Sequence, residues 1–245
     1  MTALDVAVAT LEGPKGQMPF QLFKTESSFK IAHDIFAGTT YPQVPFVGDV
    51  KTILDIGANV GAAAVYLALN YPHALVYALE PGAKPFALLK QNAQPFDSVS
   101  VFPFGLYASD KTLPLFRGRT DCVESSVCPN GRTEGGAEEI RLRSAPQFLA
   151  EQGIERIDIL KIDTEGCEVP ILRSLAKYLP TVKVLYLEYH SERDRRLLDE
   201  LLAETHVLWK GHVDLVHRGE FCYLRRDLLP GESETHTCEI LLPLE

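Results

Sequence analysis

A glycine-rich turn between an apolar strand and a helix constrains this chain more than any other part of its sequence. The apolar run at residues 52–56 contains Asp55 and leads into the turn GANVG at 57–61, which opens an alanine-rich stretch, 60–69, with the length of a helix. Glycines at 57 and 61 permit positive φ and let a ligand approach the backbone where a Cβ would clash. The first N–H groups of the helix would face that ligand. The pattern predicts a ligand-binding turn at the carboxyl end of a parallel strand.

An acid at the end of the next apolar run completes this pattern. Glu80 lies nineteen residues after Gly61 and closes the predicted strand 74–79. An acid at the tip of the second strand is placed to bind both hydroxyls of a ribose. The two halves indicate an adenosyl ligand, and the missing third glycine, with the early Asp55, favours S-adenosylmethionine over NAD. The competing interpretation is a turn that only packs the helix on the strand, with Asp55 as a cap.

Apolar runs and helical segments alternate through the rest of the chain. The predicted strands are residues 52–56, 74–79, 99–102, 113–116, 140–143, 157–162, 184–189, 207–210 and 221–225, and the predicted helices are 60–69, 84–93, 145–152, 169–179 and 193–204. Strands that alternate with helices indicate a parallel α/β sheet with right-handed crossovers. The last two strands are adjacent in the chain, without a helix between them. We therefore predict an α/β fold with a mostly parallel, doubly wound sheet that ends in an antiparallel hairpin.

The first 50 residues differ in composition from the rest of the chain. They are rich in glycine and proline, and their short apolar pieces predict a β-hairpin and then a short helix. We interpret residues 1–50 as an N-terminal extension and potential substrate cover, and residues 51–245 as the cofactor-binding domain. The polar, glycine-rich segment 117–138 is long for a loop, so it is either a disordered excursion or an active-site lid.

Composition narrows the classes of function. The 245 residues carry 24 Lys and Arg against 33 Asp and Glu, a net charge of −9 that argues against a nucleic-acid partner. No apolar run approaches the ~20 residues of a membrane span, and the first residues lack the basic start of a secretory signal. Five cysteines without C-x-x-C spacing suit a reducing compartment. These features predict a cytoplasmic protein that acts neither on nucleic acid nor at a membrane.

Four segments resemble the FkbM family of S-adenosylmethionine-dependent methyltransferases. They are LDIGANVGAAAVYLA, YALEPGAKPFALLKQNA, IDILKIDTEGCEVPILRSL and VLYLEYH, in this order between residues 52 and 190. The resemblance implies a Rossmann-like class I methyltransferase fold and methyl transfer, typically to a hydroxyl of a sugar or another small natural product. Some relatives act on nitrogen or peptides, so N-methylation of an amide or peptide side chain is the alternative. A non-catalytic interaction protein of the same fold is a second alternative.

On this resemblance, one group of residues would bind the cofactor. They are Asp55, Gly57, Ala58, Asn59 and Gly61 at its methionine and sulfonium end, Glu80 and Pro81 at its ribose, and Ser109 near its adenine ring. Ser109 is included because it lies after the third strand of the sheet, where this fold usually approaches the adenine.

Residues at strand ends are the candidates for catalysis. Ligands of an open α/β sheet lie at the carboxyl ends of its strands, where Asp163 follows the strand 157–162 and His190 follows the strand 184–189. An alcohol must lose its proton to attack a methyl group, and a histidine with a pKa near neutrality is a natural base. His190 is therefore the first candidate, with Asp163 as the alternative or as its orienting partner.

A divalent metal is a competing explanation of the same region. Some O-methyltransferases of this fold bind a metal ion at the ends of the fourth and fifth strands, where Asp163 and Glu188 lie with His190 beside them. Oxygen ligands suit Mg²⁺ or Ca²⁺, which would lower the pKa of a bound hydroxyl. Alternatively, Glu165 and Glu168 stabilise the N-terminus of the following helix.

Other residues are secondary candidates. Arginines around the polar segment could steer an anionic acceptor, whereas those of the helix 193–204 predict a solvated, self-paired face. The former are Arg117, Arg119, Arg132, Arg141 and Arg143, and the latter are Arg193, Arg195 and Arg196. His33, Trp209 and His212 could line an acceptor pocket. Cys122 and Cys128 are more often incidental thiols than a pair or a metal site.

Overall fold

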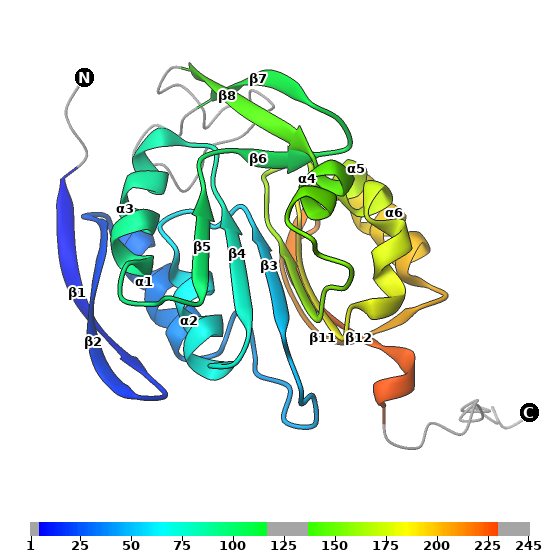
Figure 1. Cartoon of the computed structure of the whole chain (residues 1–245), viewed down its shortest axis with the longest axis horizontal. Helices are drawn as coiled ribbons and strands as arrows, with labels where there is room; N and C mark the ends of the chain where they lie inside the picture. The colour runs from blue at the N-terminus through cyan, green and yellow to red at the C-terminus, as the bar shows by residue number, and fades with distance from the viewer. Residues whose placement is uncertain (1–4, 117–136, 230–245) are drawn as a thin grey trace, which may run out of the picture.

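The computed structural model describes residues 5–116 and 137–229, which form three β-sheets (Figure 1). The central sheet has the order β11-β12-β10-β9-β3-β4-β5. Its parallel strands are β3 (Thr52–Ile56), β4 (Leu75–Leu79), β5 (Val99–Phe102), β9 (Ile159–Ile162) and β10 (Val184–Tyr189). β12 (Arg218–Arg225) runs antiparallel to β10 and to β11 (His206–Leu215). The predicted Rossmann-like sheet, mostly parallel and ending in an antiparallel hairpin, is confirmed.

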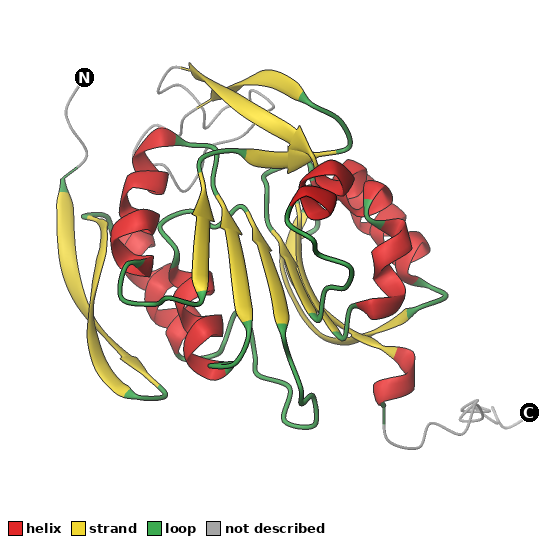
Figure 2. Ribbon diagram, in the orientation of Figure 1, coloured by secondary structure: helices red, strands yellow, loops and turns green. Residues whose placement is uncertain are grey.

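Helices cover both faces of the central sheet, and its strands are therefore buried (Figure 2). One face packs against α2 (Ala62–Asn70) and α3 (Ala83–Ala93), and the other against α4 (Ala145–Glu151), α5 (Glu168–Ser174) and α6 (Glu192–Leu202). Every residue of β9 and β10 is buried. Apolar runs without alternation are typical of such parallel strands, which explains why the sequence predicts them well.

The N-terminal segment forms the predicted hairpin and helix and shares a core with the sheet. The hairpin consists of β1 (Val6–Gly13) and β2 (Gly16–Phe23), and α1 (Glu26–Phe36) comes after it. Leu11 and Phe20 are wholly buried in the same cluster as Ala64 of α2. Asn92 of α3 accepts a hydrogen bond from the backbone N–H of Gln21 at 2.8 Å and donates one to its carbonyl oxygen at 2.8 Å. The division of the chain at residue 50 stays a prediction.

Two helix boundaries differ from the prediction for local reasons. The helix predicted at 60–69 begins at Ala62, because Gly61 has a left-handed φ of 92°. The helix predicted at 169–179 is divided into α5 and a 3-10 helix, η1 (Ala176–Thr181). At the break, the Ser174 hydroxyl donates to the carbonyl oxygen of Ile171 at 2.7 Å, a bond that competes with the regular helical pattern. A last 3-10 turn, η2 (Arg226–Leu228), comes after β12.

A three-stranded sheet lies beside the carboxyl ends of the central strands (Figure 1). In it, β8 (Ala137–Ser144) pairs in parallel with β6 (Gly105–Tyr107) and antiparallel with β7 (Lys111–Phe116). The strands predicted at 113–116 and 140–143 lie within β7 and β8, whereas β6 is missed because three residues show no periodicity. Most of the predicted excursion or lid, with Cys122, Cys128 and Arg117, Arg119 and Arg132, lies outside the described residues. None of the helices in the described ranges is long and apolar enough to cross a membrane.

Candidate active site

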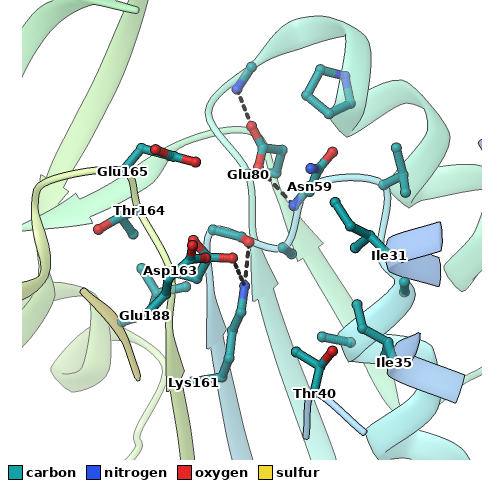
Figure 3. A pocket seen from close by; sticks show the side chains of 18 of the residues that line it. Ile31, Ile35, Thr40, Asn59, Glu80, Lys161, Asp163, Thr164, Glu165 and Glu188 are labelled. Atoms are coloured by element: carbon teal, nitrogen blue, oxygen red, sulfur yellow. Dashed lines mark hydrogen bonds and ion pairs between the residues drawn. The ribbon is translucent and has the colours of Figure 1, made fainter. Parts of the chain in front are cut away.

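A cavity of about 490 Å³ lies at the carboxyl ends of the central strands (Figure 3). The turns after β3, β4 and β9 form its floor, and α1 and the end of β10 stand on opposite sides. Its volume lies in the range of small-molecule and cofactor sites, roughly 300–1,000 Å³. The cavity brings together most of the predicted site residues, which are Gly57, Ala58, Asn59, Glu80, Pro81, Asp163 and Glu188.

The turn after β3 has the left-handed backbone that its glycines predict. Gly57, Asn59 and Gly61 have φ values of 83°, 49° and 92°. The reason for the glycines is nevertheless different from the predicted approach of a ligand. A Cβ on Gly57 would lie 1.8 Å from the carbonyl oxygen of Asp163, and one on Gly61 would lie 2.7 Å from Cδ1 of Leu89. The glycines therefore allow the turn to pack against its own protein, and Gly61 is not among the residues that line the cavity.

Glu80 is held by the turn on the cofactor side of the cavity (Figure 3). Its carboxylate accepts hydrogen bonds from the backbone N–H groups of Asn59 at 2.8 Å and of Gly82 at 2.7 Å. Burial raises the pKa of Glu80 to about 7, although these two bonds act in the opposite direction. A carboxylate has about four acceptor positions, so two remain for the hydroxyls of a ribose.

A second observation also fits an adenosyl ligand. The side-chain oxygen Oδ1 of Asn59 is buried and has no hydrogen-bond partner among the described residues, although Asn59 lines the cavity. A buried acceptor without a partner costs free energy, which a donor group on a bound ligand would recover. Asn59 and Glu80 would therefore hold the polar groups of the cofactor, with Ala58 and Pro81 beside them.

Two predicted cofactor residues lie elsewhere. Asp55 is wholly buried and does not line the cavity, and its Oδ1 lies 3.2 Å from Nζ of Lys161. Ser109 is exposed and does not line the cavity. After β5 the chain enters β6 of the three-stranded sheet. Gly105 and Leu106 of β6 line the cavity, and Ser109 lies beyond them. Ser109 as a cofactor residue stays a prediction that the shape of this cavity does not support.

Asp163 and Glu188 form a pair of acids on the other side of the cavity. Both line it, and Glu188 is 8% exposed. Burial, together with the charge of Glu188 as the next cause, raises the pKa of Asp163 to about 7. Burial also opposes the ionisation of Glu188, but His190 and Arg218 hold its pKa below the usual value. The two acids therefore differ: Glu188 is a fixed anion, and Asp163 exchanges a proton near neutral pH.

His190 lies behind this pair, among carboxylates. Its Nε2 lies 3.1 Å from Glu165 and 3.5 Å from Glu188, and its Nδ1 lies 3.2 Å from Glu168. Burial alone would lower the pKa of His190, but these carboxylates raise it far above the usual value. A protonated imidazole has no free lone pair to take a proton, and His190 is not among the residues that line the cavity. Its surroundings argue against the predicted role as the base.

The carboxylate of Glu168 holds the loop before α5. It accepts hydrogen bonds from the backbone N–H groups of Thr164 at 3.0 Å and of Gly166 at 3.1 Å. These groups precede α5, so Glu168, which lies in the first turn of that helix as the alternative interpretation expects, also orders the loop that carries Asp163. Together with His190, it fixes the end of β9 against the end of β10.

The predicted metal ligands do not form one set. The group with ligand atoms within 4.8 Å of one another is Asp163, Glu165 and His190, without Glu188. Glu188 instead accepts a hydrogen bond from Nε of Arg218 at 2.5 Å, and Glu165 contacts His190. These two cations already occupy the carboxylates that a hard divalent ion would need. The residues at this position therefore fit Mg²⁺ poorly, and no step is assigned to a metal.

The wall opposite the acids comes from the N-terminal segment and combines apolar side chains with the polar Lys30, Asp34 and Thr40 (Figure 3). Ile31 and Ile35 of α1 face the cavity there. The segment after α1 is fixed to the sheet, because the hydroxyl of Tyr186 on β10 donates to the carbonyl oxygen of Pro42 at 2.7 Å, and its ring packs edge-on against Tyr41. The sequence predicts this segment as a potential substrate cover, but its cavity-lining residues carry no motif and are not predicted individually.

The secondary candidates are mostly remote from the cavity. His212 lines it, whereas His33 is exposed and Trp209 packs against Phe46 with ring centroids 6.4 Å apart. The arginines of α6 form the predicted self-paired face, in which Arg195 and Arg196 both bind Glu192.

Comparison with known proteins identifies the family of this chain. The model of the methyltransferase FkbM domain matches residues 55–208, more than half of the chain. The chain belongs to the FkbM methyltransferase family. As an FkbM protein it is an S-adenosylmethionine-dependent methyltransferase, which confirms the prediction from its motifs. The matched range contains the turn, Glu80 and Asp163 but excludes α1 and its cavity wall.

Individual relatives of this FkbM protein differ in size and name. It is 29% identical to the AMB antimetabolite synthetase AmbE of Pseudomonas aeruginosa, over 94% of this chain but only 12% of that protein. It is 26% identical to the 31-O-demethyl-FK506 methyltransferase FkbM of Streptomyces tacrolimicus, over 84% of this chain and 88% of the relative. It is 25% identical to the hexuronic acid methyltransferase AglP of Haloferax volcanii, over 62% and 61% of the two chains.

Solved structures that resemble this chain are more distant in sequence. The putative methyltransferase yhhF from Escherichia coli aligns with a TM-score of 0.48 and 13% identity, over 87% of this chain and 94% of that one. A likeness of this degree says nothing about the acceptor.

Proposed function

We propose that this protein transfers a methyl group to a hydroxyl of a sugar or of another small natural product, with Asp163 as the proton acceptor. The observation that supports this most strongly is the position of Asp163, which lines the cavity directly beside the turn of the predicted cofactor site. The acceptor would lie between Asp163 and the wall formed by α1 (Figure 3).

The chemistry places two demands on the protein. S-adenosylmethionine, when bound, supplies an electrophilic methyl group on a positively charged sulfur. The hydroxyl oxygen of the acceptor must lie in line with the methyl–sulfur bond, which breaks as the oxygen–carbon bond forms. The hydroxyl proton must leave, and the Asp163 carboxylate is placed to take it. A base with a pKa near the working pH is the most effective for this task, and Asp163 has a pKa of about 7.

The names of two relatives support the choice of acceptor. One is named as an O-methyltransferase of a demethylated FK506 and the other as a methyltransferase of hexuronic acid. An acceptor that presents both hydroxyls and carbon atoms would suit this mixed polar and apolar lining. Sugars have this character, since their rings carry C–H groups between the hydroxyls.

A panel of acceptors tests the proposal. The protein is incubated with methyl-labelled S-adenosylmethionine and methyl glycosides, uronic acids, hydroxy acids, and primary amines or amides of similar size. We expect labelled methyl ethers from one of the hydroxyl classes and no labelled amines, because Asp163 is placed to take a proton from a neutral hydroxyl. Equal rates with EDTA and with added Mg²⁺ are expected as well. Transfer to the amines or amides alone would overturn the proposal in favour of N-methylation.

Glu80→Gln tests the cofactor half of the site. The substitution keeps the shape of the side chain but removes the charge that would bind two ribose hydroxyls. Hydrogen bonds to charged groups contribute about 1.5–3 kcal/mol, so the Kd for S-adenosylhomocysteine should rise about 10- to 100-fold. Isothermal titration calorimetry measures this change. Glu200→Gln, an exposed residue of α6, is the matched control and should bind like the wild type. An unchanged Kd in Glu80→Gln would remove Glu80 from the site.

A further inference from the structure

A buried lysine joins the turn after β3 to the acid at the end of β9 (Figure 3). Lys161 belongs to β9 and is 3% exposed. Its ammonium nitrogen, Nζ, donates to the carbonyl oxygen of Gly57 at 2.6 Å. The same nitrogen lies 3.2 Å from Oδ1 of Asp55 and 3.6 Å from Oδ2 of Asp163. Neither the sequence motifs nor the family assignment gives this side chain a role.

The counter-charge of Lys161 does not by itself account for all of its contacts. Burial of an ammonium group is costly unless a counter-charge and hydrogen-bond acceptors compensate it. Asp55, which is wholly buried, supplies the counter-charge on its own. The ammonium group also donates a hydrogen bond to the carbonyl oxygen of Gly57 and forms a longer ion pair with Asp163.

These two further contacts lie on the two halves of the cavity. Gly57 begins the turn that carries Asn59 and supports Glu80, on the cofactor side. Asp163 lies on the acceptor side. The backbone brings the two halves close, since the carbonyl oxygen of Asp163 faces Gly57 where a side chain would otherwise be. Lys161 is the side chain that connects both halves from below.

We propose that Lys161 is a positioning residue for methyl transfer, which fixes the Asp163 carboxylate relative to the Gly57 turn. The proposal rests on the proposed role of Asp163 as the proton acceptor. Its physical basis is the strict geometry of in-line displacement, in which a misplacement of about 1 Å costs on the order of 100-fold in rate. Lys161 is itself among the residues that line the cavity, and the role proposed for it is exerted through Asp163 and the turn.

A mutant cycle with Lys161→Met and Asp163→Asn tests this. Methionine keeps the length of the side chain but loses the charge and the donors. The kcat for the fastest hydroxyl acceptor of the panel is measured in the wild type, both single variants and the double variant. We expect Lys161→Met to lower kcat about 100-fold. Because Lys161 acts through Asp163, the double variant should fall no further than Asp163→Asn, within about threefold.

A purely structural role predicts a different result. In that case the losses of the two single variants would multiply in the double variant, or Lys161→Met would keep kcat within about threefold of the wild type. Either outcome overturns the proposal. Binding of S-adenosylhomocysteine gives a second readout, and we expect a rise in Kd for Lys161→Met because the turn loses its bond to Lys161.

The cycle is also run with Asp55→Asn in all four proteins, because Lys161→Met alone leaves Asp55 buried without a counter-charge. With both buried charges removed, the folded state no longer holds an unpaired ion. The expected pattern of kcat is the same, and a return of kcat to the wild-type value in Asp55→Asn/Lys161→Met would overturn the proposal. If Asp163→Asn itself keeps the wild-type kcat, the proposed function fails. If only Asp163→Asn is slow, the positioning role alone fails.

Discussion

Gly57→Ala is expected to destabilise the protein more than any other single substitution in the site. The new Cβ would lie 1.8 Å from the carbonyl oxygen of Asp163, at a backbone φ of 83° that alanine rarely adopts. The ends of β3 and β9 would have to separate, although the N–H of Asp163 donates to the carbonyl oxygen of Ile56 at 3.1 Å. We expect a loss of more than about 4 kcal/mol in the free energy of unfolding, or no folded protein. Urea denaturation measures this loss.

Gly153→Ala is the matched control for this experiment. Gly153 also has a positive φ, 66°, but a Cβ at that position would meet nothing within 4 Å. Its cost is that of the left-handed backbone alone, about 1–2 kcal/mol. Similar losses in the two variants would show that the contact with Asp163 is not the reason for glycine at position 57.

Asp163→Asn is expected to have the largest effect on catalysis. Asparagine has the same shape but cannot take the hydroxyl proton, so kcat should fall about 100- to 10,000-fold. The Kd for S-adenosylhomocysteine should stay within about twofold of the wild type, because Asp163 is proposed to contact the acceptor and not the cofactor. Both are measured, kcat with the fastest hydroxyl acceptor of the panel and Kd by calorimetry.

The pH dependence of the same variant separates loss of a base from loss of structure. Burial and the charge of Glu188 raise the pKa of Asp163 to about 7. A base works only when deprotonated, so kcat/KM of the wild type should rise with pH through about 7 and level off above it. The residual rate of Asp163→Asn should lack this rise. Asp227→Asn, an exposed residue of η2 paired with Arg225, removes the same charge and should keep the wild-type profile. A wild-type profile in Asp163→Asn would exclude it as the base.

The features that the sequence predicts correctly depend on neighbours along the chain. The turn after β3 and the acid at the end of β4 each lie within a few residues of a strand that is buried on both faces. The order of the strands in the sheet is limited as well, because right-handed crossover connections between parallel strands permit few topologies. For this reason motif spacing alone predicts that Asn59 and Glu80 lie together, and both line the cavity.

The features that sequence reasoning misses depend on contacts across the sheet. An isolated histidine has the pKa expected of a base, but carboxylates from the loop after β9, from the start of α5 and from β10 raise the pKa of His190. From the sequence, Lys161 is only one residue of a predicted buried strand, because its ion pair with Asp55 on β3 cannot be predicted. Ser109 lies outside the cavity because β6, only three residues long, turns the chain away from it.

The attachment of α1 to the rest of the fold has a consequence for how acceptors are chosen. Its inner side, with Ala32 and Phe36, belongs to the core that includes α2, and the bond between Tyr186 and Pro42 ties the next segment to β10. Ile31, by contrast, is 38% exposed toward the cavity. A wall anchored in this way selects by preformed shape, so binding loses little conformational entropy. Exchange of one exposed side chain on a rigid helix would then retune the choice of acceptor while leaving the fold unchanged.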